Sequence, residues 1–263
     1  MAEFDTIILE QYEGVAKITL NRPDAANGIN LQMARELLQA AIQCDEDAAV
    51  RAVLITAKGK LFCAGGDLKS FAGYGEGIAA KLKELTTYLH AAITRFARMQ
   101  APVIVAVNGT AAGAGFSLAV AGDLVLAAES AKFTMAYTAA GLSPDGSSSY
   151  YLPRLIGLRK TQELMLTNRR LSAQEAMQWG AITRVIADED LQAVAAELAV
   201  QMANGPTLAN GAVKKLLLNS FNHGLETQME DEARYIAAMA KLEDGKEGIS
   251  AFMEKRKPEF KGK

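Results

Sequence analysis

The chain has 263 residues, of which 50% are hydrophobic and 22% are charged, and 28 Lys+Arg against 30 Asp+Glu give a formal charge of −2. These values are typical of a globular protein and exclude a disordered, collagen-like or coiled-coil chain. The near-neutral charge also disfavours nucleic acid as a partner, because a nucleic-acid-binding surface must neutralise many phosphates.

Neither a membrane anchor nor a disulfide framework is predicted. No apolar stretch approaches the roughly 20 residues that a membrane-spanning helix needs, and residues 1–5 lack the basic and apolar regions of a secretory signal. Cys44 and Cys63 are too few for a disulfide framework or a structural zinc site. We therefore expect a cytoplasmic protein without a bound metal.

The first half of the chain alternates strand patterns with helical ones. Residues 4–9 and 15–20 are expected to form two strands, and apolar spacing over residues 31–42 predicts a helix. Further short strands and a long helix follow in chain order, with strands at 53–56, 103–107 and 124–128 and the helix stripe at 82–96. Strands that are apolar throughout are usually covered on both faces, which predicts an α/β protein with helices packed on a sheet.

The second half is dominated by helical patterns. Beyond about residue 157, only residues 182–186 are expected to form a strand. The segment Asn204-Gly205-Pro206 is the best candidate boundary, which predicts a core of residues 1–203 and a helical region of residues 204–263 that together form one functional unit. This helical region could pack on its own core or on a neighbouring subunit.

Two glycine-rich stretches follow apolar strands, at residues 62–68 and 108–116, and each is expected to open a helix. Small residues there allow backbone N–H groups to approach a ligand closely, so the two stretches could direct two N–H groups at one oxyanion. A dinucleotide site is disfavoured, because the third small position of that fingerprint is Leu118. Close packing of strand on helix, without a ligand, is the alternative for either stretch.

Three side chains are candidates for chemistry. Asp145 follows Pro144 in a Gly/Ser-rich loop before a helical segment, where a carboxylate is either an acid/base group or a helix N-cap. His90 lies at the edge of the apolar face of the long helix, where a half-buried histidine without a function is common. Cys63 has no histidine or other base at local spacing, so we do not expect it to be a nucleophile.

The sequence resembles the crotonase (enoyl-CoA hydratase/isomerase) superfamily over essentially its whole length. The resemblance rests on five segments in register, at residues 16–30, 52–71, 101–128, 157–185 and 247–261. It implies a ClpP/crotonase-like spiral of repeated ββα units with a C-terminal helical trimerisation region, assembled as a homotrimer or a dimer of trimers. It also implies an acyl-CoA thioester substrate, with coenzyme A entering as part of that substrate and no separate cofactor.

The resemblance also implies roles for individual residues. The N–H groups of Gly66 and Ala114 would form an oxyanion hole for the thioester oxygen. Contacts with coenzyme A would come from three segments, through Asp24, Ala25, Ala26, Ala64, Asp67, Leu68, Lys69, Phe252 and Lys255. The last two of these match positions that reach a nucleotide 3′-phosphate from a neighbouring subunit.

Departures from the hydratase pattern bear on the reaction. Hydratases of this superfamily use two glutamates, at positions that are Ser117 and Tyr137 here, and neither of these side chains can act as a carboxylate base. The acid stands instead at Asp145, after a proline, as in the Δ3,Δ2-enoyl-CoA isomerases and the ring-epoxide isomerase of phenylacetate breakdown. We therefore expect an isomerase that moves a double bond from the 3- to the 2-position, with Asp145 as acid/base and with His90 and Tyr137 orienting it.

The sequence also resembles the 4-chlorobenzoyl-CoA dehalogenase branch, which carries comparable residues at the positions of His90, Tyr137 and Asp145. There the aspartate attacks the ring and the histidine activates water, so a dehalogenating or hydrolytic CoA enzyme is an alternative. That branch lacks the proline found here as Pro144, and its pocket is rich in Phe and Trp, whereas Trp179 is the only Trp here. An enoyl-CoA hydratase and an acyl-CoA binder without turnover are further alternatives.

Overall fold

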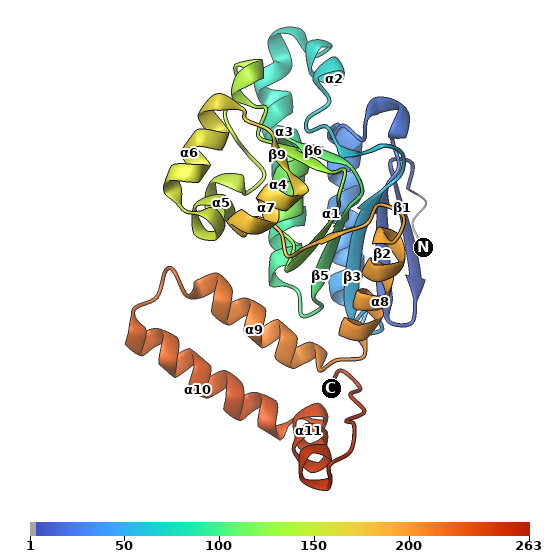
Figure 1. The fold of residues 1–263 in the computed structure, drawn as a ribbon, viewed down its shortest axis with the longest axis vertical. Helices are drawn as coiled ribbons and strands as arrows, with labels where there is room; N and C mark the ends of the chain where they lie inside the picture. Colours follow the sequence, from blue (N-terminus) through green and yellow to red (C-terminus); the bar gives the residue numbers. More distant parts are fainter. Residues whose placement is uncertain (1–3) are drawn as a thin grey trace.

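The computed structural model describes residues 4–263 (Figure 1). Its larger sheet has six strands in the order β1-β2-β3-β5-β7-β10. The first two strands pair antiparallel and all further neighbours pair parallel, with bounds β1 (Ile7–Tyr12), β2 (Val15–Leu20), β3 (Ala52–Ala57), β5 (Val103–Val107), β7 (Leu124–Ala128) and β10 (Arg184–Ile186). Strands β3 and β5 are buried along their whole length, as their continuous apolar sequences predict.

A second sheet of four short strands accompanies the first, in the order β4-β6-β8-β9, with bounds β4 (Leu61–Cys63), β6 (Thr110–Ala112), β8 (Lys132–Thr134) and β9 (Leu171–Ser172). Strand β4 follows β3 in the chain, β6 follows β5, and β8 follows β7. The chain thus repeats a unit of one strand in each sheet followed by a helix. This repeat is the spiral of ββα units expected from the resemblance.

Helices cover these sheets (Figure 1). Helix α1 (Leu31–Glu46) packs on α3 (Ile78–Arg98), and α8 (Leu191–Ala203) packs against β2, β3, β5 and β7. Shorter helices and 3-10 turns connect the strands: η1 (Pro23–Ala25), α2 (Leu68–Ala72), η2 (Gly75–Gly77), α4 (Ala114–Val120), η3 (Thr138–Ala140), α5 (Ser148–Ile156), α6 (Leu158–Thr167) and α7 (Ala173–Trp179). Every residue of α4 is buried, so this helix lies inside the core.

The last three helices, α9 (Thr207–Asn219), α10 (Leu225–Lys241) and α11 (Glu243–Glu254), extend away from the core at one end of the molecule (Figure 1). The boundary expected after residue 203 coincides with the end of α8. Helix α9 is nevertheless fixed to the core, because the buried Lys214 Nζ lies 2.8 Å from Asp123 Oδ2 and donates to the carbonyls of Phe96 and Ala101. None of the described side chains of α10 is buried.

Several boundaries differ from those expected. The first strand occupies residues 7–12 rather than 4–9. It remains hydrogen-bonded to β2 as far as the turn, although Glu10 and Gln11 are exposed. The short strands β4, β6, β8 and β9 were not expected, since they are too brief to show a period. The last expected strand, 182–186, begins at residue 184, and the tail contains a further helix at 243–254.

Candidate active site

The first glycine-rich stretch is held by the loop that follows β2. Ala64 N donates to Ala26 O at 3.0 Å, Ile29 N donates to Gly65 O at 2.8 Å, and Asp67 N donates to Ile29 O at 3.0 Å. These backbone bonds form because the loop and the stretch run side by side in the parallel sense. The structure therefore brings together the two N-terminal segments that the resemblance assigns to coenzyme A.

Asp67 holds this stretch in place. Its Oδ1 accepts a hydrogen bond from Ser70 N at 3.0 Å, which caps α2, and its Oδ2 lies 2.9 Å from Arg22 Nη2. Burial favours a higher pKa for this carboxyl, but the hydrogen bonds from Ser70 and Arg22 outweigh burial and lower the pKa. Arg22 also donates to the carbonyl of Gly28. Arg22 was not predicted to be a site residue. The one feature that could have indicated it is its place in the segment 16–30, which resembles the superfamily.

Gly66 and Ala114, the two residues whose N–H groups are the expected oxyanion donors, line one pocket. Among residues 4–263 neither N–H has a protein acceptor, and Ala114 is the first residue of α4, where a helix leaves its N–H groups unpaired. The preceding residues, Gly65 with φ +102 and Gly113 with φ +50, adopt backbone conformations that side chains disfavour. A Cβ on Gly66 would lie 2.7 Å from the ring of Phe71, so any larger residue there would displace that ring.

The two glycine-rich stretches pack closely against each other. A Cβ on Gly115 would lie 2.4 Å from Cys63 O, and Gly65 N donates to Cys63 Sγ at 3.4 Å. Burial raises the pKa of the Cys63 thiol to about 12, so it is protonated at neutral pH and is not a nucleophile, in agreement with the sequence expectation. The two glycine-rich stretches are therefore closely packed and also carry two unpaired N–H groups. Close packing of strand on helix does not account for those N–H groups, so the oxyanion-hole interpretation is kept.

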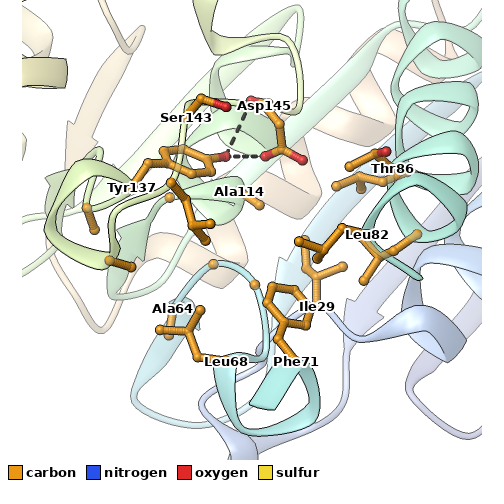
Figure 2. Close-up of a pocket in the computed structure, with 18 of the residues that line it drawn as sticks. Ile29, Ala64, Leu68, Phe71, Leu82, Thr86, Ala114, Tyr137, Ser143 and Asp145 are labelled. Atoms are coloured by element: carbon orange, nitrogen blue, oxygen red, sulfur yellow. Dashed lines mark hydrogen bonds between the residues drawn. The ribbon is translucent and has the colours of Figure 1, made fainter. Parts of the chain in front are cut away.

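A cavity of about 300 Å³ joins the two N–H groups to the side chains of Tyr137 and Asp145 (Figure 2). Its walls are mostly apolar and come from the loop after β2, from α2, from α3 and from the segment after η3, through Ile29, Leu68, Phe71, Leu82, Leu85, Leu89 and Leu142. Thr86 and Ser143 add side chains with hydroxyl groups to the lining (Figure 2).

Asp145 is the carboxylate of this cavity. Tyr137 Oη donates to Asp145 Oδ1 at 2.5 Å, as Figure 2 shows. Burial, and then the charge of Asp145, raise the pKa of the Tyr137 phenol, which therefore remains a protonated donor. The N-cap interpretation of Asp145 is wrong: α5 begins at Ser148 after the N-cap residue Ser147, and the Asp145 carboxylate accepts no backbone N–H.

His90 contacts the loop that carries Asp145. Its Nε2 lies 3.7 Å from Asp145 Oδ2 and accepts a hydrogen bond from Gly146 N at 3.2 Å. An imidazole nitrogen that accepts is unprotonated, so this arrangement places the proton of the neutral ring on Nδ1. The side chain is 49% exposed, because His90 lies beside the buried stripe of α3 rather than on it.

The backbone of Asp145 is held by two buried hydroxyl groups. Ser117 Oγ donates to Asp145 O at 2.8 Å and lies 3.1 Å from Tyr137 Oη. Ser148 Oγ donates to the same carbonyl at 3.1 Å. The sequence showed Ser117 only as the replacement of a hydratase glutamate, and nothing in the sequence distinguished Ser148.

The other residues assigned to coenzyme A divide into two groups. Those of the first group are exposed or half-buried around η1 and the start of α2, namely Asp24, Ala25, Ala26, Ala64, Leu68 and Lys69. Phe252, which is 82% exposed, and Lys255 belong to α11 and its C-cap, at the opposite end of the molecule from α2 (Figure 1). A single chain therefore does not bring Phe252 and Lys255 to the pocket.

Within residues 4–263 no group of three or more His, Cys, Asp or Glu side chains is placed to hold a metal ion. No helix in that part of the chain is long and apolar enough to cross a membrane.

Comparison with known proteins gives consistent matches. The family model for "Enoyl-CoA hydratase/isomerase" matches residues 10–263. The chain is 39% identical to 1,2-epoxyphenylacetyl-CoA isomerase of Escherichia coli (strain K12), over 100% of both chains. It is 36% identical to 4-chlorobenzoyl coenzyme A dehalogenase-2 of Arthrobacter sp., over 88% of this chain and 84% of the other. The crystal structure of enoyl-CoA hydratase from Bacillus anthracis matches with a TM-score of 0.92 at 34% identity, over 98% of this chain and 100% of that chain.

Proposed function

The chain belongs to the enoyl-CoA hydratase/isomerase family of the crotonase superfamily, whose members act on acyl-CoA thioesters. On this basis we propose that it moves a carbon–carbon double bond of an unsaturated acyl-CoA from the 3- to the 2-position. One observation carries the proposal: among residues 4–263, Asp145 is the only carboxylate that lines the cavity, and Gly66 and Ala114, whose N–H groups have no protein acceptor in that range, line it too. The family's hydratase positions, Ser117 and Tyr137, supply no second carboxylate.

In the proposed reaction the thioester oxygen accepts hydrogen bonds from the N–H groups of Gly66 and Ala114. Removing a proton from C2 moves negative charge onto that oxygen, and two fixed donors stabilise this charge without reorganising. Donors of this kind contribute about 3 kcal/mol each in other enzymes. The glycines before both donors, and the contact between Gly66 and Phe71, hold the two N–H groups in place.

Asp145 is proposed to act first as base and then as acid. Its carboxylate takes the proton from C2, the electron pair passes to the thioester oxygen through the conjugated chain, and the same proton or one from solvent is delivered to C4. The product therefore has the mass of the substrate. Asp145 is suited to this role because its side chain lines a cavity whose walls are mostly apolar.

Tyr137 and His90 are proposed to orient Asp145. The Tyr137 hydroxyl occupies Oδ1 and so leaves Oδ2 available to the substrate. The Nε2 lone pair of His90 accepts the N–H of Gly146, so that nitrogen is not available to activate water. This arrangement favours isomerisation over hydrolysis or dehalogenation.

Coenzyme A is proposed to enter as part of the substrate, along the segments that hold Asp24–Ala26 and Ala64–Lys69, and no separate cofactor is invoked. Phe252 and Lys255 would reach the site of a neighbouring subunit in a homotrimer or a dimer of trimers. Support for such an assembly comes from α10 and α11, whose exposed apolar side chains include Leu225, Met229, Ile236, Phe252 and Met253. Light scattering of the purified protein would test the assembly.

The test of the reaction is incubation with 3-enoyl-, 2-enoyl- and 4-halobenzoyl-CoA, followed by mass spectrometry and chromatography. We expect a product of unchanged mass from 3-enoyl-CoA, and we expect Asp145→Ala to abolish it. Asp190→Asn, an exposed aspartate before α8, is the matched control and should keep full activity. Undiminished isomerisation by Asp145→Ala would refute the assignment.

A second candidate is a dehalogenating CoA enzyme. The observation in its favour is that His90, Tyr137 and Asp145 lie in contact around one loop, as the resemblance to the dehalogenase branch implies. Release of halide from 4-halobenzoyl-CoA, together with exchange of halogen for hydroxyl in the product, would favour this candidate over the isomerase.

A further inference from the structure

The backbone carbonyl of Asp145 is bound by two buried serine hydroxyls that differ in what they connect. Ser148 lies three residues further along the same loop, at the start of α5, and donates to this carbonyl at 3.1 Å. Ser117 lies on α4 and donates to it at 2.8 Å. Both side chains are fully buried, with 0% exposure, so water does not compete for these bonds. Of these two serines, only Ser117 joins the Asp145 loop to another element.

The element that Ser117 belongs to is the one that carries an oxyanion donor. Helix α4 begins at Ala114, and Ser117 N donates to Gly113 O at 3.0 Å across the first turn of this helix. One helical turn therefore separates the Ala114 N–H from the hydroxyl that holds Asp145. We infer that Ser117 is a positioning residue, which sets the placement of the acid/base Asp145 relative to the oxyanion hole; the inference rests on the proposed function.

The Ser117 anchor is separate from the Tyr137 anchor. Tyr137 Oη donates to the carboxylate of Asp145 at 2.5 Å and lies 3.3 Å from the Asp145 carbonyl, whereas Ser117 Oγ donates to that carbonyl at 2.8 Å. A hydroxyl has one proton, and the carbonyl can only accept, so the shortest contact of Ser117 takes that proton. Tyr137 therefore orients the side chain, and Ser117 fixes the chain segment from which that side chain projects.

A short residue at position 117 is required for this arrangement. Gly146 has φ +61, and a Cβ on it would lie 3.0 Å from Ser117 Cβ, so the loop rests directly on Ser117. The Ser117 hydroxyl is also enclosed by Gly113 O at 3.3 Å and Tyr137 Oη at 3.1 Å. A glutamate at position 117 would need the space that the Asp145 loop occupies. A carboxylate at 117 and Asp145 in its present place therefore exclude each other.

Positioning matters because Asp145 must serve two carbon atoms. After the proton has left C2, Asp145 can return it to C2, which regenerates the substrate, or deliver it to C4, which forms the product. A displaced Asp145 delivers to C4 more slowly, so the intermediate persists and exchanges its proton with solvent. In D2O this increases the deuterium at C2 of the recovered substrate relative to the product formed.

The experiment compares Ser117→Ala with Ser148→Ala in D2O, using 3-enoyl-CoA as substrate. Each variant removes one hydrogen bond to the same carbonyl, but only Ser117→Ala breaks the link to α4. For Ser117→Ala we expect kcat to fall by about tenfold to a hundredfold, with KM little changed. We also expect a rise in the deuterium ratio, which is the deuterium at C2 of the recovered substrate divided by the product formed. For Ser148→Ala we expect the wild-type ratio. Ser117→Cys, which fills a similar space with a weak donor, should raise the ratio as Ser117→Ala does.

The inference would be overturned by either of two results. One is an equal loss of kcat in Ser117→Ala and Ser148→Ala, and the other is a fall in the kcat of Ser117→Ala with an unchanged deuterium ratio. Circular dichroism and thermal melting establish that each variant is folded. A wild-type protein that neither isomerises the substrate nor exchanges its C2 proton would instead contradict the proposed function, so the two failures are distinguishable.

Discussion

Replacing Ala114 with proline would delete one oxyanion donor with little change elsewhere. Ala114 is the first residue of α4, a helix position that tolerates proline because its N–H has no partner within the helix. The preceding Gly113 has ψ −124, which lies outside the α region that a following proline disfavours. The proline ring would also occupy space in the pocket at the place where the thioester oxygen is expected.

The expected loss follows from the number of donors. Gly66 and Ala114, whose N–H groups are the two expected donors, line the pocket, so the variant retains one of the two. Loss of one such donor costs about 2.7–4 kcal/mol, which corresponds to about 10²–10³-fold in kcat. Steady-state isomerisation of 3-enoyl-CoA measures this loss. The larger ring could also weaken substrate binding, so KM is measured separately.

Glu243→Pro provides the matched control for this experiment. Glu243 is the first residue of α11, and the preceding Leu242 has ψ 165, which suits a following proline. This variant introduces the same ring at a helix start outside the pocket and should keep wild-type kcat. A folded Ala114→Pro protein with kcat within about threefold of the wild type would refute the oxyanion-hole reasoning.

Three further predictions concern stability and assembly. Lys214→Ala should lower the free energy of unfolding by about 3–5 kcal/mol in urea melts, because it leaves the partly buried Asp123 without its cation. Arg22→Leu should cost roughly 1–2 kcal/mol at pH 7. Because folding lowers the pKa of Asp67, this ion pair stabilises the fold above the unfolded pKa of about 3.9. The cost should therefore decrease as pH falls through the lower folded pKa, to the part that comes from the bond between Arg22 and the Gly28 carbonyl. Ile236→Glu, on the exposed face of α10, should reduce the mass of the assembly in light scattering, and an unchanged mass would exclude that face from the interface.

The long strands of the fold could be predicted from local sequence alone. Residues 15–20, 103–107 and 124–128 form strands with the expected bounds, because each combines a short, mainly apolar sequence with complete or nearly complete burial. The three-residue strands β4 and β6 could not be predicted in this way. They are shorter than any detectable period and depend on pairing with segments distant in the chain.

Some residues of the candidate site could be predicted from the sequence, and others could not. The two glycine-rich stretches could be predicted because glycines after apolar strands are visible locally, whereas Gly66 and Ala114 within them were assigned only by the resemblance. The contact between Tyr137 and Asp145 was suggested only by the resemblance. The part played by Ser117 depends on the position of the Asp145 carbonyl, which no local pattern encodes. The link from Arg22 to Asp67 likewise joins residues that are far apart in the chain.

The central claim is that Asp145 alone supplies the acid/base carboxylate. The most direct measurement is the single-turnover rate of 3-enoyl-CoA isomerisation by Asp145→Asn, which keeps the size of the side chain and removes its basicity. We expect a loss of about 10²–10⁴-fold, with binding of the acyl-CoA retained. A rate within about fivefold of the wild type, in a folded protein that binds the substrate, would contradict it.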